Sequence, residues 1–409
     1  MSVKWKIVFS LIFILNITLL FSQKKEDQSL LLQLGNKQHK DKTIEVFSEK
    51  IYSAREGKSI PFLKMIREMR NDSFIYVGEN HDSLPMHDIQ LQIIQALLKQ
   101  DRNLSIGLEM LPVTCQEVLN KWNLGILATE EFIKEASWYE NWDFNFGFYN
   151  KIFEFAKINR IPLYALNVPR QIIRKIRIKG WEALSGEEKN LVPKPDLSHE
   201  EHRKLIRAIF ESTELPPQMK GKGLESAFEG LYRAQSAWDE VMAFYALQAA
   251  DKEERKMVVL AGSGHLLYNL GINRRAHEKN NLPYKTVICV TVPEDKKRIR
   301  ISRSLADYIW GIGEEARPAF PSVGLKFKKF EGLENLVIEI KPIAGVARNA
   351  DFKKGDVLLS ADGKRFSDIN ELKIHLSKFS WGDRVRFRLL REAREIEIEL
   401  QFQTTENKN

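Results

Sequence analysis

The chain has 409 residues, of which 43% are hydrophobic, 29% charged and 10% aromatic, with 63 Lys and Arg against 55 Asp and Glu. At roughly 150 residues per domain this length predicts two or three domains, and the composition excludes a disordered, collagenous or disulfide-dense chain. The mean hydropathy of −0.34 argues against several membrane spans, and the net charge of +8 is too dispersed to indicate nucleic-acid binding.

The first 22 residues have the three parts of a secretion signal. Lys4 and Lys6 form a charged start, residues 7–21 are mostly apolar, and the small residue Ser22 precedes a polar stretch. The apolar run is shorter than the roughly 20 residues of a bilayer span. We therefore expect export to the periplasm or cell envelope, with an uncleaved N-terminal anchor as the alternative. No cysteine follows the run, so we expect no lipid anchor on cysteine.

A polar lead-in and the pattern of an α/β domain follow, up to residue 311. Residues 23–60 are polar, which predicts a tether and a lead-in helix. Beyond them, short apolar strands alternate with amphipathic helices, which predicts a largely parallel sheet flanked by helices. The five predicted strands are residues 73–78, 104–109, 162–167, 256–262 and 284–292.

Residues 170–250, between the third and fourth strands, are charged and helical in pattern. They far exceed the dozen or so residues that a parallel crossover needs, which predicts a helical cap. Glycines and prolines over 312–322 indicate a linker between an α/β domain at 61–311 and a small β-rich domain at 323–403. The chain has two cysteines, Cys115 and Cys289, which we expect to be buried free thiols rather than a disulfide.

Polar residues follow four of the predicted strands where each strand ends. Because the carboxyl ends of parallel strands meet at one edge of a sheet, we expect these side chains to converge there. Two imidazoles and two carboxylates among them suit a divalent metal ion or general acid–base catalysis. The residues are Glu79 and His81 after the first strand, Glu109 and Asn167 at the ends of the second and third, and His265 after the fourth.

Three further features need an interpretation, and two of them, His87 and an aromatic run, allow two. His87 either joins this group or only begins a helix, and His199 and His202 are expected on a solvated helix face. The third feature is an aromatic run, which either forms core or lines a pocket for a large flat ligand. The run consists of Trp138, Tyr139, Trp142, Phe144, Phe146, Phe148 and Tyr149.

The motifs around these polar residues resemble the ChaN-like family, the haem-binding uptake branch of the superfamily that includes Tiki and TraB proteins. The matching stretches are Gly-Glu-Asn-His-Asp at 78–82, Leu-Glu-Met at 108–110, Ala-Leu-Asn-Val-Pro-Arg at 165–170, Ala-Gln-Ser-Ala-Trp-Asp-Glu-Val-Met-Ala at 234–243 and Ala-Gly-Ser-Gly-His-Leu at 261–266. The resemblance implies an α/β fold and haem binding in iron acquisition. ChaN-like proteins are typically lipoproteins, and in this respect the chain departs from the family.

The resemblance also implies roles for particular residues. Related branches imply metal-dependent hydrolysis, with Glu79, His81, Glu109 and His265 as catalytic or metal-binding residues. For haem, the candidate contacts are Tyr139, Trp142, Tyr149, Arg170, Tyr232, Asp239 and Tyr268. A tyrosine among them is the expected axial ligand, and a divalent metal ion is the alternative cofactor.

The last domain resembles a bacterial PDZ domain. Residues 323–327 are similar to a carboxylate-binding loop, with Gly324, Leu325, Lys326 and Phe327 as candidate peptide-binding residues, and residues 353–363 are similar to the strand and turn that follow. Such a loop directs backbone N–H groups at a peptide C-terminus while the peptide adds a strand to the sheet edge. The alternatives are that this domain is only an intramolecular brace, or that it is an adaptor attached to an inert α/β domain.

Overall fold

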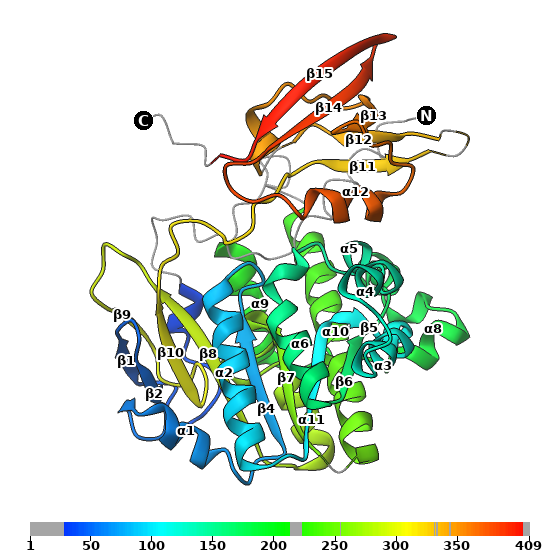
Figure 1. The fold of residues 1–409 in the computed structure, drawn as a ribbon. Helices are drawn as coiled ribbons and strands as arrows, with labels where there is room; N and C mark the ends of the chain where they lie inside the picture. Colours follow the sequence, from blue (N-terminus) through cyan, green and yellow to red (C-terminus); the bar gives the residue numbers. More distant parts are fainter. Residues whose placement is uncertain are drawn as a thin grey trace. The chain divides into compact units, whose positions relative to one another are not determined.

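The computed structural model describes residues 28–212, 223–253, 255–330, 332, 334–342 and 345–403. The predicted secretion signal lies outside these residues. Across the described ranges, no helix is both long and apolar enough to cross a bilayer. The chain divides into two compact units, which are described separately below (Figure 1). The first contains the chain through His81, Pro85–Gln116 and Ile161–Glu314, and the second contains Asp82–Leu84, Glu117–Arg160 and the chain from Glu315 onward.

The first unit is built on an eight-stranded mixed sheet. Its strands, in spatial order, are β3 (Lys58–Ile60), β2 (Ile51–Ser53), β10 (Tyr308–Gly313), β8 (Tyr284–Val292), β4 (Phe74–Glu79), β7 (Lys256–Gly262), β5 (Leu104–Pro112) and β6 (Leu163–Asn167). All neighbouring pairs from β10 to β6 are parallel, and β2 pairs antiparallel with both β10 and β3. The predicted, largely parallel sheet is therefore confirmed.

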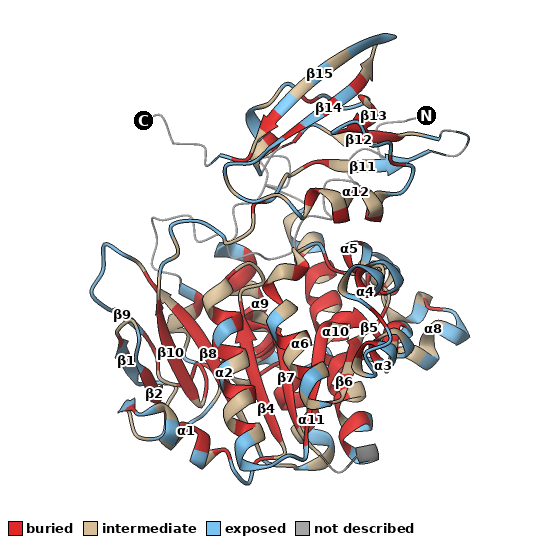
Figure 2. Cartoon of the chain, in the orientation of Figure 1, coloured by how far each residue is buried: buried red, intermediate tan, exposed pale blue. Residues whose placement is uncertain are grey.

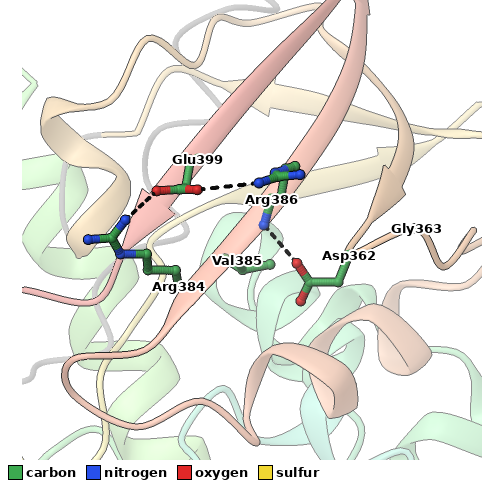
Figure 3. A pocket seen from close by; sticks show the side chains of 6 residues that line it. All are labelled: Asp362, Gly363, Arg384, Val385, Arg386 and Glu399. Carbon is green, nitrogen blue, oxygen red and sulfur yellow. Dashed lines mark hydrogen bonds and ion pairs between the residues drawn. The ribbon is translucent and has the colours of Figure 1, made fainter.

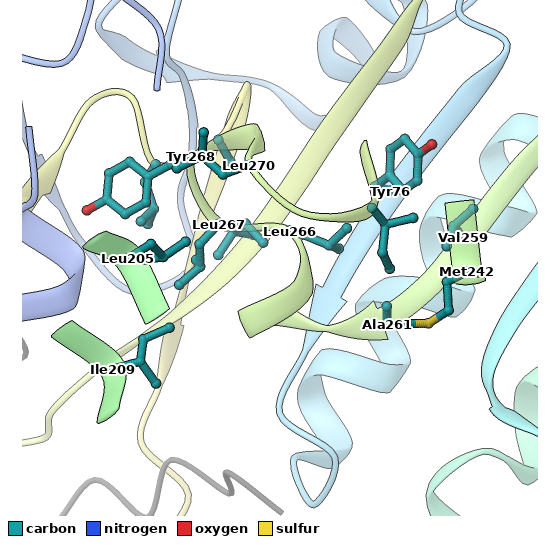
Figure 4. Packing of buried hydrophobic residues seen from close by; sticks show 14 of the residues in the cluster. Tyr76, Leu205, Ile209, Met242, Val259, Ala261, Leu266, Leu267, Tyr268 and Leu270 are labelled. Carbon is teal, nitrogen blue, oxygen red and sulfur yellow. The ribbon is translucent and has the colours of Figure 1, made fainter. Parts of the chain in front are cut away.

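The central strands are apolar along their whole length because both faces of the sheet are covered. Every residue of β4 and β5 is buried (Figure 2). The helices of this unit are α1 (Phe62–Glu68), α2 (Leu84–Gln100), α7 (Arg170–Lys179), α8 (Gly186–Leu191), α9 (Glu200–Ser212), α10 (Leu224–Glu253) and α11 (Ile272–Asn280). Helices α7 to α10 occupy the predicted helical insertion. In the core, Met242 of α10 packs beside Val259 and Ala261 of β7 (Figure 4).

The beginning of the described chain differs from the prediction. Residues 28–60 contain no lead-in helix but one 3₁₀ turn (Gln28–Leu31) and the strands β1 (Thr43–Val46), β2 and β3. Strand β1 alternates between exposed and buried residues and pairs with β9 (Ile299–Ser302) in a two-stranded ribbon. The helix prediction failed because it rested on polar composition, whereas the apolar residues of β1 recur with the period of two that is typical of a strand.

The second unit contains a five-stranded antiparallel sheet with its own core, as expected for the β-rich domain. Its strands, in order, are β11 (Lys326–Lys329), β12 (Leu336–Ile340), β13 (Val357–Ala361), β14 (Arg384–Arg391) and β15 (Arg394–Gln401). Helix α12 (Ile369–Leu376) turns Leu372 and Leu376 into this core beside Phe387. Strand β11 is at one edge of the sheet.

The same unit also includes residues 117–160, which the sequence pattern assigned to the α/β domain. Their helices are α3 (Gln116–Asn123), α4 (Thr129–Glu135), α5 (Trp138–Asn141) and α6 (Asn150–Asn159). Helix α12 packs against α4 and α5. The Nζ atom of Lys373 on α12 donates to the carbonyl oxygen of Tyr139 at 3.1 Å, and Asn145 Nδ2 donates to the carbonyl oxygen of Ser377 at 3.0 Å.

Candidate functional site

A carboxylate after β4 holds two imidazoles. Glu79 is the last residue of β4 and is fully buried. One of its oxygens lies 3.0 Å from Nδ1 of His81, and the other lies 3.1 Å from Nδ1 of His87. His87 also approaches Gln90 at 3.0 Å and the carbonyl oxygen of His81 at 3.3 Å. His87 therefore belongs to the polar group rather than only beginning α2.

A second group is centred on His265. Its Nε2 atom lies 3.2 Å from Glu109 Oε1, and its Nδ1 atom lies 2.5 Å from Asp239 Oδ1. Gln235 Nε2 is 2.7 Å from the same Nδ1 atom. The other oxygen of Asp239 lies 3.1 Å from His202, whose side chain is fully buried. The expectation that His202 is on a solvated helix face is therefore wrong.

The two groups meet at Gly262, the last residue of β7. Its register partner on β4 is Glu79, and its backbone N–H donates to Glu109 Oε2 at 2.6 Å. A Cβ atom at this position would lie 2.7 Å from Cε1 of His81. The site thus needs glycine here because the imidazole of His81 fills the space that a side chain would take. The predicted convergence of Glu79, His81, Glu109 and His265 around adjoining strand ends is what the geometry shows.

An irregularity in β5 shapes the Glu109 side of the site. Leu108 pairs with Ala165 on β6, but the next pair is Pro112 with Asn167, so β5 has two extra residues between the pairs. Such a bulge redirects side chains at a strand end. Asn167 Nδ2 closes the bulge by donating to the carbonyl oxygen of Glu109 at 3.0 Å. Asn167 therefore supports Glu109 through its backbone.

The charges of the two groups depend on one another. Burial alone would raise the pKa of Glu79, but the adjacent His87 and His81 hold this pKa well below its usual range. Burial is likewise overcome at Asp239, where His265 and His202 lower the pKa of the carboxyl. Burial would lower the pKa of His265, yet the carboxylates of Glu109 and Asp239 raise this pKa to about 10.

This arrangement stabilises a charged imidazole between two carboxylates. The raised pKa of His265 favours the imidazolium form, in which Nε2 donates toward Glu109 and Nδ1 toward Asp239. Glu109 beside it is held in the ionised form that can accept a proton, although its lowered pKa makes this carboxylate a weaker base than one whose pKa lies near neutral pH. Within the described part of the chain, no three His, Cys, Asp or Glu residues are arranged to share one metal ion. The metal-binding role of Glu79, His81, Glu109 and His265 stays a prediction.

The candidate haem tyrosines of the first unit are buried and form hydrogen bonds with the backbone of the same unit. The hydroxyl of Tyr232 donates to the carbonyl oxygen of Leu197 at 3.2 Å, and burial raises its pKa. The hydroxyl of Tyr268 donates to the carbonyl oxygen of Ser29 at 2.7 Å, while its ring packs in the core beside Leu267 (Figure 4). Both side chains are about 1% exposed.

The remaining aromatic candidates lie in the second unit. The hydroxyl of Tyr149 accepts from Nε1 of Trp142 at 3.1 Å, and that of Tyr139 accepts from the backbone of Phe146 at 3.4 Å. Trp138 packs edge-on against Phe146, with ring centroids 4.9 Å apart. The aromatic run therefore makes core in this unit, which is the first of its two interpretations.

Two further side chains, one beside His265 and one directly after β6, are partly exposed. The ring of Trp238, one turn of α10 from Gln235, is nearly perpendicular to the imidazole of His265, with centroids 6.1 Å apart. Arg170 begins α7, directly after β6, and is half-buried. Sequence reasoning did not select Trp238 or Gln235 as functional residues. Both lie on the α10 stretch that resembles the ChaN-like motif, at the i, i+3 and i+4 spacing that also includes Asp239.

Both cysteines are free and buried, as expected. Cys289 lies inside β8, and burial raises the pKa of its thiol to about 12. A thiol with so high a pKa is protonated at neutral pH and is a poor nucleophile. Neither cysteine therefore adds to the chemistry of the site.

Comparison with known proteins supports this view of the fold and places the chain in a family. A solved structure titled "Cofacial heme binding to ChaN of Campylobacter jejuni" is 22% identical, with a TM-score of 0.51, and the match covers 64% of this chain and 95% of that one. The protein RETICULATA-RELATED 5, chloroplastic, of Arabidopsis thaliana is 25% identical over 258 residues, covering 59% of this chain. The chain spans only 34% of the length of that relative.

Two family models match the sequence, over separate stretches of the chain. The PDZ domain model matches residues 321–402. The model described as haem-binding uptake, Tiki superfamily, ChaN matches residues 65–276, more than half of the chain. This is the stretch that contains Glu79, His81, Glu109, Asp239 and His265. The chain belongs to the ChaN family of the Tiki superfamily and has a C-terminal PDZ domain.

Proposed function

We propose that the protein binds haem at the carboxyl edge of the first unit's sheet, with His81 as the axial ligand. The observation that carries the proposal is the pairing of a partly exposed imidazole with a buried carboxylate. The side chain of His81 is 15% exposed and Glu79 is buried against its Nδ1 atom. A carboxylate in this position orients a ligating imidazole and increases its basicity. The bond to iron would then be made through Nε2.

The rest of the edge supplies what haem requires. Trp238 provides a flat apolar wall, and Arg170 can neutralise a propionate through charge-assisted hydrogen bonds. The four candidate tyrosines are less suitable, because their hydroxyls are buried and hydrogen-bonded within the fold. Together with the predicted secretion signal, haem binding supports a role in haem or iron acquisition in the cell envelope.

A haem titration of the full chain tests this proposal. We expect saturation at a defined ratio and a distinct Soret shift. His81→Ala should weaken binding about tenfold or more because it removes an iron ligand. Tyr232→Phe and Tyr268→Phe are the controls and should leave the spectrum unchanged. A non-saturating titration of the wild-type chain contradicts haem binding, and a Soret shift that persists in His81→Ala contradicts the choice of ligand.

The ion pairs around His265 favour a second candidate, a hydrolase that uses Glu109 as general base. Glu109 is buried, and although burial opposes ionisation, His265 keeps its pKa below the usual range. If the site hydrolyses esters, Glu109→Gln should abolish release of nitrophenol from p-nitrophenyl acetate while haem binding remains. A metal ion at the same residues would activate the water instead. Equal turnover by the wild type and the variant would reject this candidate.

For the C-terminal unit we propose docking of a peptide C-terminus. Gly324 is in the left-handed region, with φ of 78°, and begins the approach to the edge strand β11. The backbone N–H groups of Gly324 and Leu325 make no hydrogen bond to another described residue. Two successive N–H groups of this kind suit a terminal carboxylate.

A further inference from the structure

The loop between β4 and α2, residues 80–83, carries His81 and is held by several contacts. The ring of His81 is held by Glu79, and its carbonyl oxygen lies 3.3 Å from Nε2 of His87. The backbone N–H of Asn80 donates to Sδ of Met86 at 3.0 Å. All of these partners belong to the same short stretch of chain. One more contact of the loop is with a residue far away in the sequence.

This distant contact is made by Ser83. The side chain of Ser83 is buried, and its hydroxyl donates to Oε2 of Glu315 at 2.7 Å, although the two residues are 232 positions apart. Hydrogen bonds from a hydroxyl to an ionised carboxylate are shorter and stronger than those between neutral groups. Because Ser83 lies two residues after His81, the bond fixes the loop close to the proposed iron ligand.

The strand order explains why Glu315 reaches this loop. Strand β10 is parallel to β8, and β8 is parallel to β4, so the three strands end at the same edge of the sheet. Strand β10 ends at Gly313, which pairs with Val292 at the end of β8. The chain that follows β10 therefore emerges at the edge where the chain that follows β4 carries His81 and Ser83.

Glu315 also brings a negative charge to the beginning of α2. Ser83 directly precedes this helix, which has no acidic residue in its own first turn. A carboxylate stabilises the N-terminus of a helix because this end carries a partial positive charge. The bond to Ser83 thus holds the carboxylate of Glu315 beside the first turn of α2, which contains His87. Both imidazoles that contact Glu79 are close in sequence to this anchored point.

The ion pairs of the C-terminal hairpin are of a different kind. Across β14 and β15, Arg384 lies 2.9 Å and Arg386 lies 3.7 Å from the carboxylate of Glu399, and these side chains line a shallow exposed pocket (Figure 3). Exposed pairs such as these contribute little to stability. They join neighbouring strands of one hairpin, whereas the bond from Ser83 to Glu315 involves a buried hydroxyl and joins distant parts of the chain.

We propose that Glu315 is a positioning residue for haem, which holds the His81 loop through Ser83 so that Nε2 of His81 is presented to the iron. The proposal rests on the proposed haem binding through His81 and adds a residue that acts through another side chain. A ligand that is already fixed in its binding conformation lowers the cost of ordering on binding. Loss of the hydrogen bond should therefore weaken haem binding while the ligand itself remains.

Haem titrations of full-chain variants test the proposal. Ser83→Ala and Glu315→Ala should each weaken binding about fivefold and change the Soret band at saturation, since a hydrogen bond to a charged group is lost. Glu315→Gln keeps an acceptor for the hydroxyl and should bind within about twofold of the wild type. The double alanine variant should bind no more weakly than either single variant, because all three lack the same bond.

The matched control is Glu314→Ala. It removes the neighbouring carboxylate, which accepts from the backbone N–H of Glu294 at 3.0 Å rather than from the loop. This variant should bind haem like the wild type. Equal weakening by Glu314→Ala and Glu315→Ala would overturn the proposal, because it would show that the effect comes from charge in this segment and not from the bond to Ser83.

Hydrogen exchange of the haem-free chain, followed by mass spectrometry, tests the loop itself. Amides over residues 80–90 should exchange about fivefold faster in Ser83→Ala and Glu315→Ala than in the wild type and Glu314→Ala. Unchanged haem affinity in both variants overturns the positioning role, whether or not exchange is faster, while haem binding stands. A non-saturating titration of the wild type overturns haem binding, and the positioning role with it.

Discussion

At the scale of single residues, the site depends on how closely backbone and imidazole approach at Gly262. The strand pairing fixes this residue opposite Glu79, and the ring of His81 lies over its Cα. A methyl group there would push the imidazole away from Glu79. The buried carboxylate would then lose one of the two groups that lower its pKa.

We therefore predict that Gly262→Ala lowers the free energy of unfolding by about 1–3 kcal/mol, the usual cost of overpacking. It should also weaken haem binding, because His81 is displaced. Gly264→Ala is the control, since a Cβ atom there has no neighbour within 4 Å. Urea denaturation followed by circular dichroism measures the difference. Equal stability of the two variants would contradict the close packing at Gly262.

His265 gives a prediction for pH. Its pKa rises from 6.5 to about 10 in the folded state because, although burial opposes the charge, Glu109 and Asp239 favour it. A group whose pKa is raised on folding makes its full contribution to the free energy of unfolding below its unfolded pKa. This contribution is lost as the pH rises through its folded pKa. The stabilisation by His265 should therefore be complete below pH 6.5 and fade between about pH 6.5 and 10.

Replacement of the imidazole should remove this dependence. His265→Gln leaves Glu109 and Asp239 buried without a cation, which should cost about 3 kcal/mol near pH 6. The difference between wild type and variant should shrink steadily toward pH 10. Urea titrations at intervals of one pH unit measure it. Parallel stability curves for the two proteins would show that His265 is not charged in the fold.

At the scale of elements, the sequence predicts long apolar strands better than it predicts short strands or strands that contain glycine. Strands β4, β5 and β7 are continuous apolar runs, so their existence and their order in a parallel sheet could be inferred. Strand β2 was missed because it has only three residues, and β10 was missed because it contains two glycines. Gly311 in β10 is a case in point, since a Cβ atom there would lie 2.1 Å from the carbonyl oxygen of Phe47. Glycine is therefore needed at this position for the close approach of the two chain segments.

Helix α9 shows where a usable signal was overlooked. Its charged residues suggested a solvated helix, yet His202 shares its face with Leu205, Ile206 and Ile209, all of which are buried. The spacing i, i+3, i+4 and i+7 marks that stripe in the sequence. The partner of His202 could not be inferred from spacing, because Asp239 lies on α10 and the contact depends on how the two helices pack.

For the whole molecule, the division into units does not follow the order of the sequence. The motifs that mark the ChaN and PDZ parts are contiguous, so they predict two successive domains. The structure instead joins residues 117–160, which connect β5 to β6, to the chain after Glu314. The contacts that do this, such as the hydrogen bond from Lys373 to the backbone of Tyr139, join residues far apart in the sequence and leave no local pattern in it.

This connection predicts that a chain ending at Glu314 loses more than its last domain. Without α12, residues 129–141 are deprived of the surface on which α4 and α5 pack, and buried residues such as Phe132 and Trp138 have less to hold them in place. Their amide hydrogens should exchange at least about tenfold faster than in the full chain, since protection follows local opening. Amides in β4 and β7, whose partners are all retained, should change little. Hydrogen exchange followed by mass spectrometry compares both regions in one experiment. If α4 and α5 are equally protected in both chains, residues 117–160 fold independently of the C-terminal sheet, and the two domains are as separate as their motifs suggest.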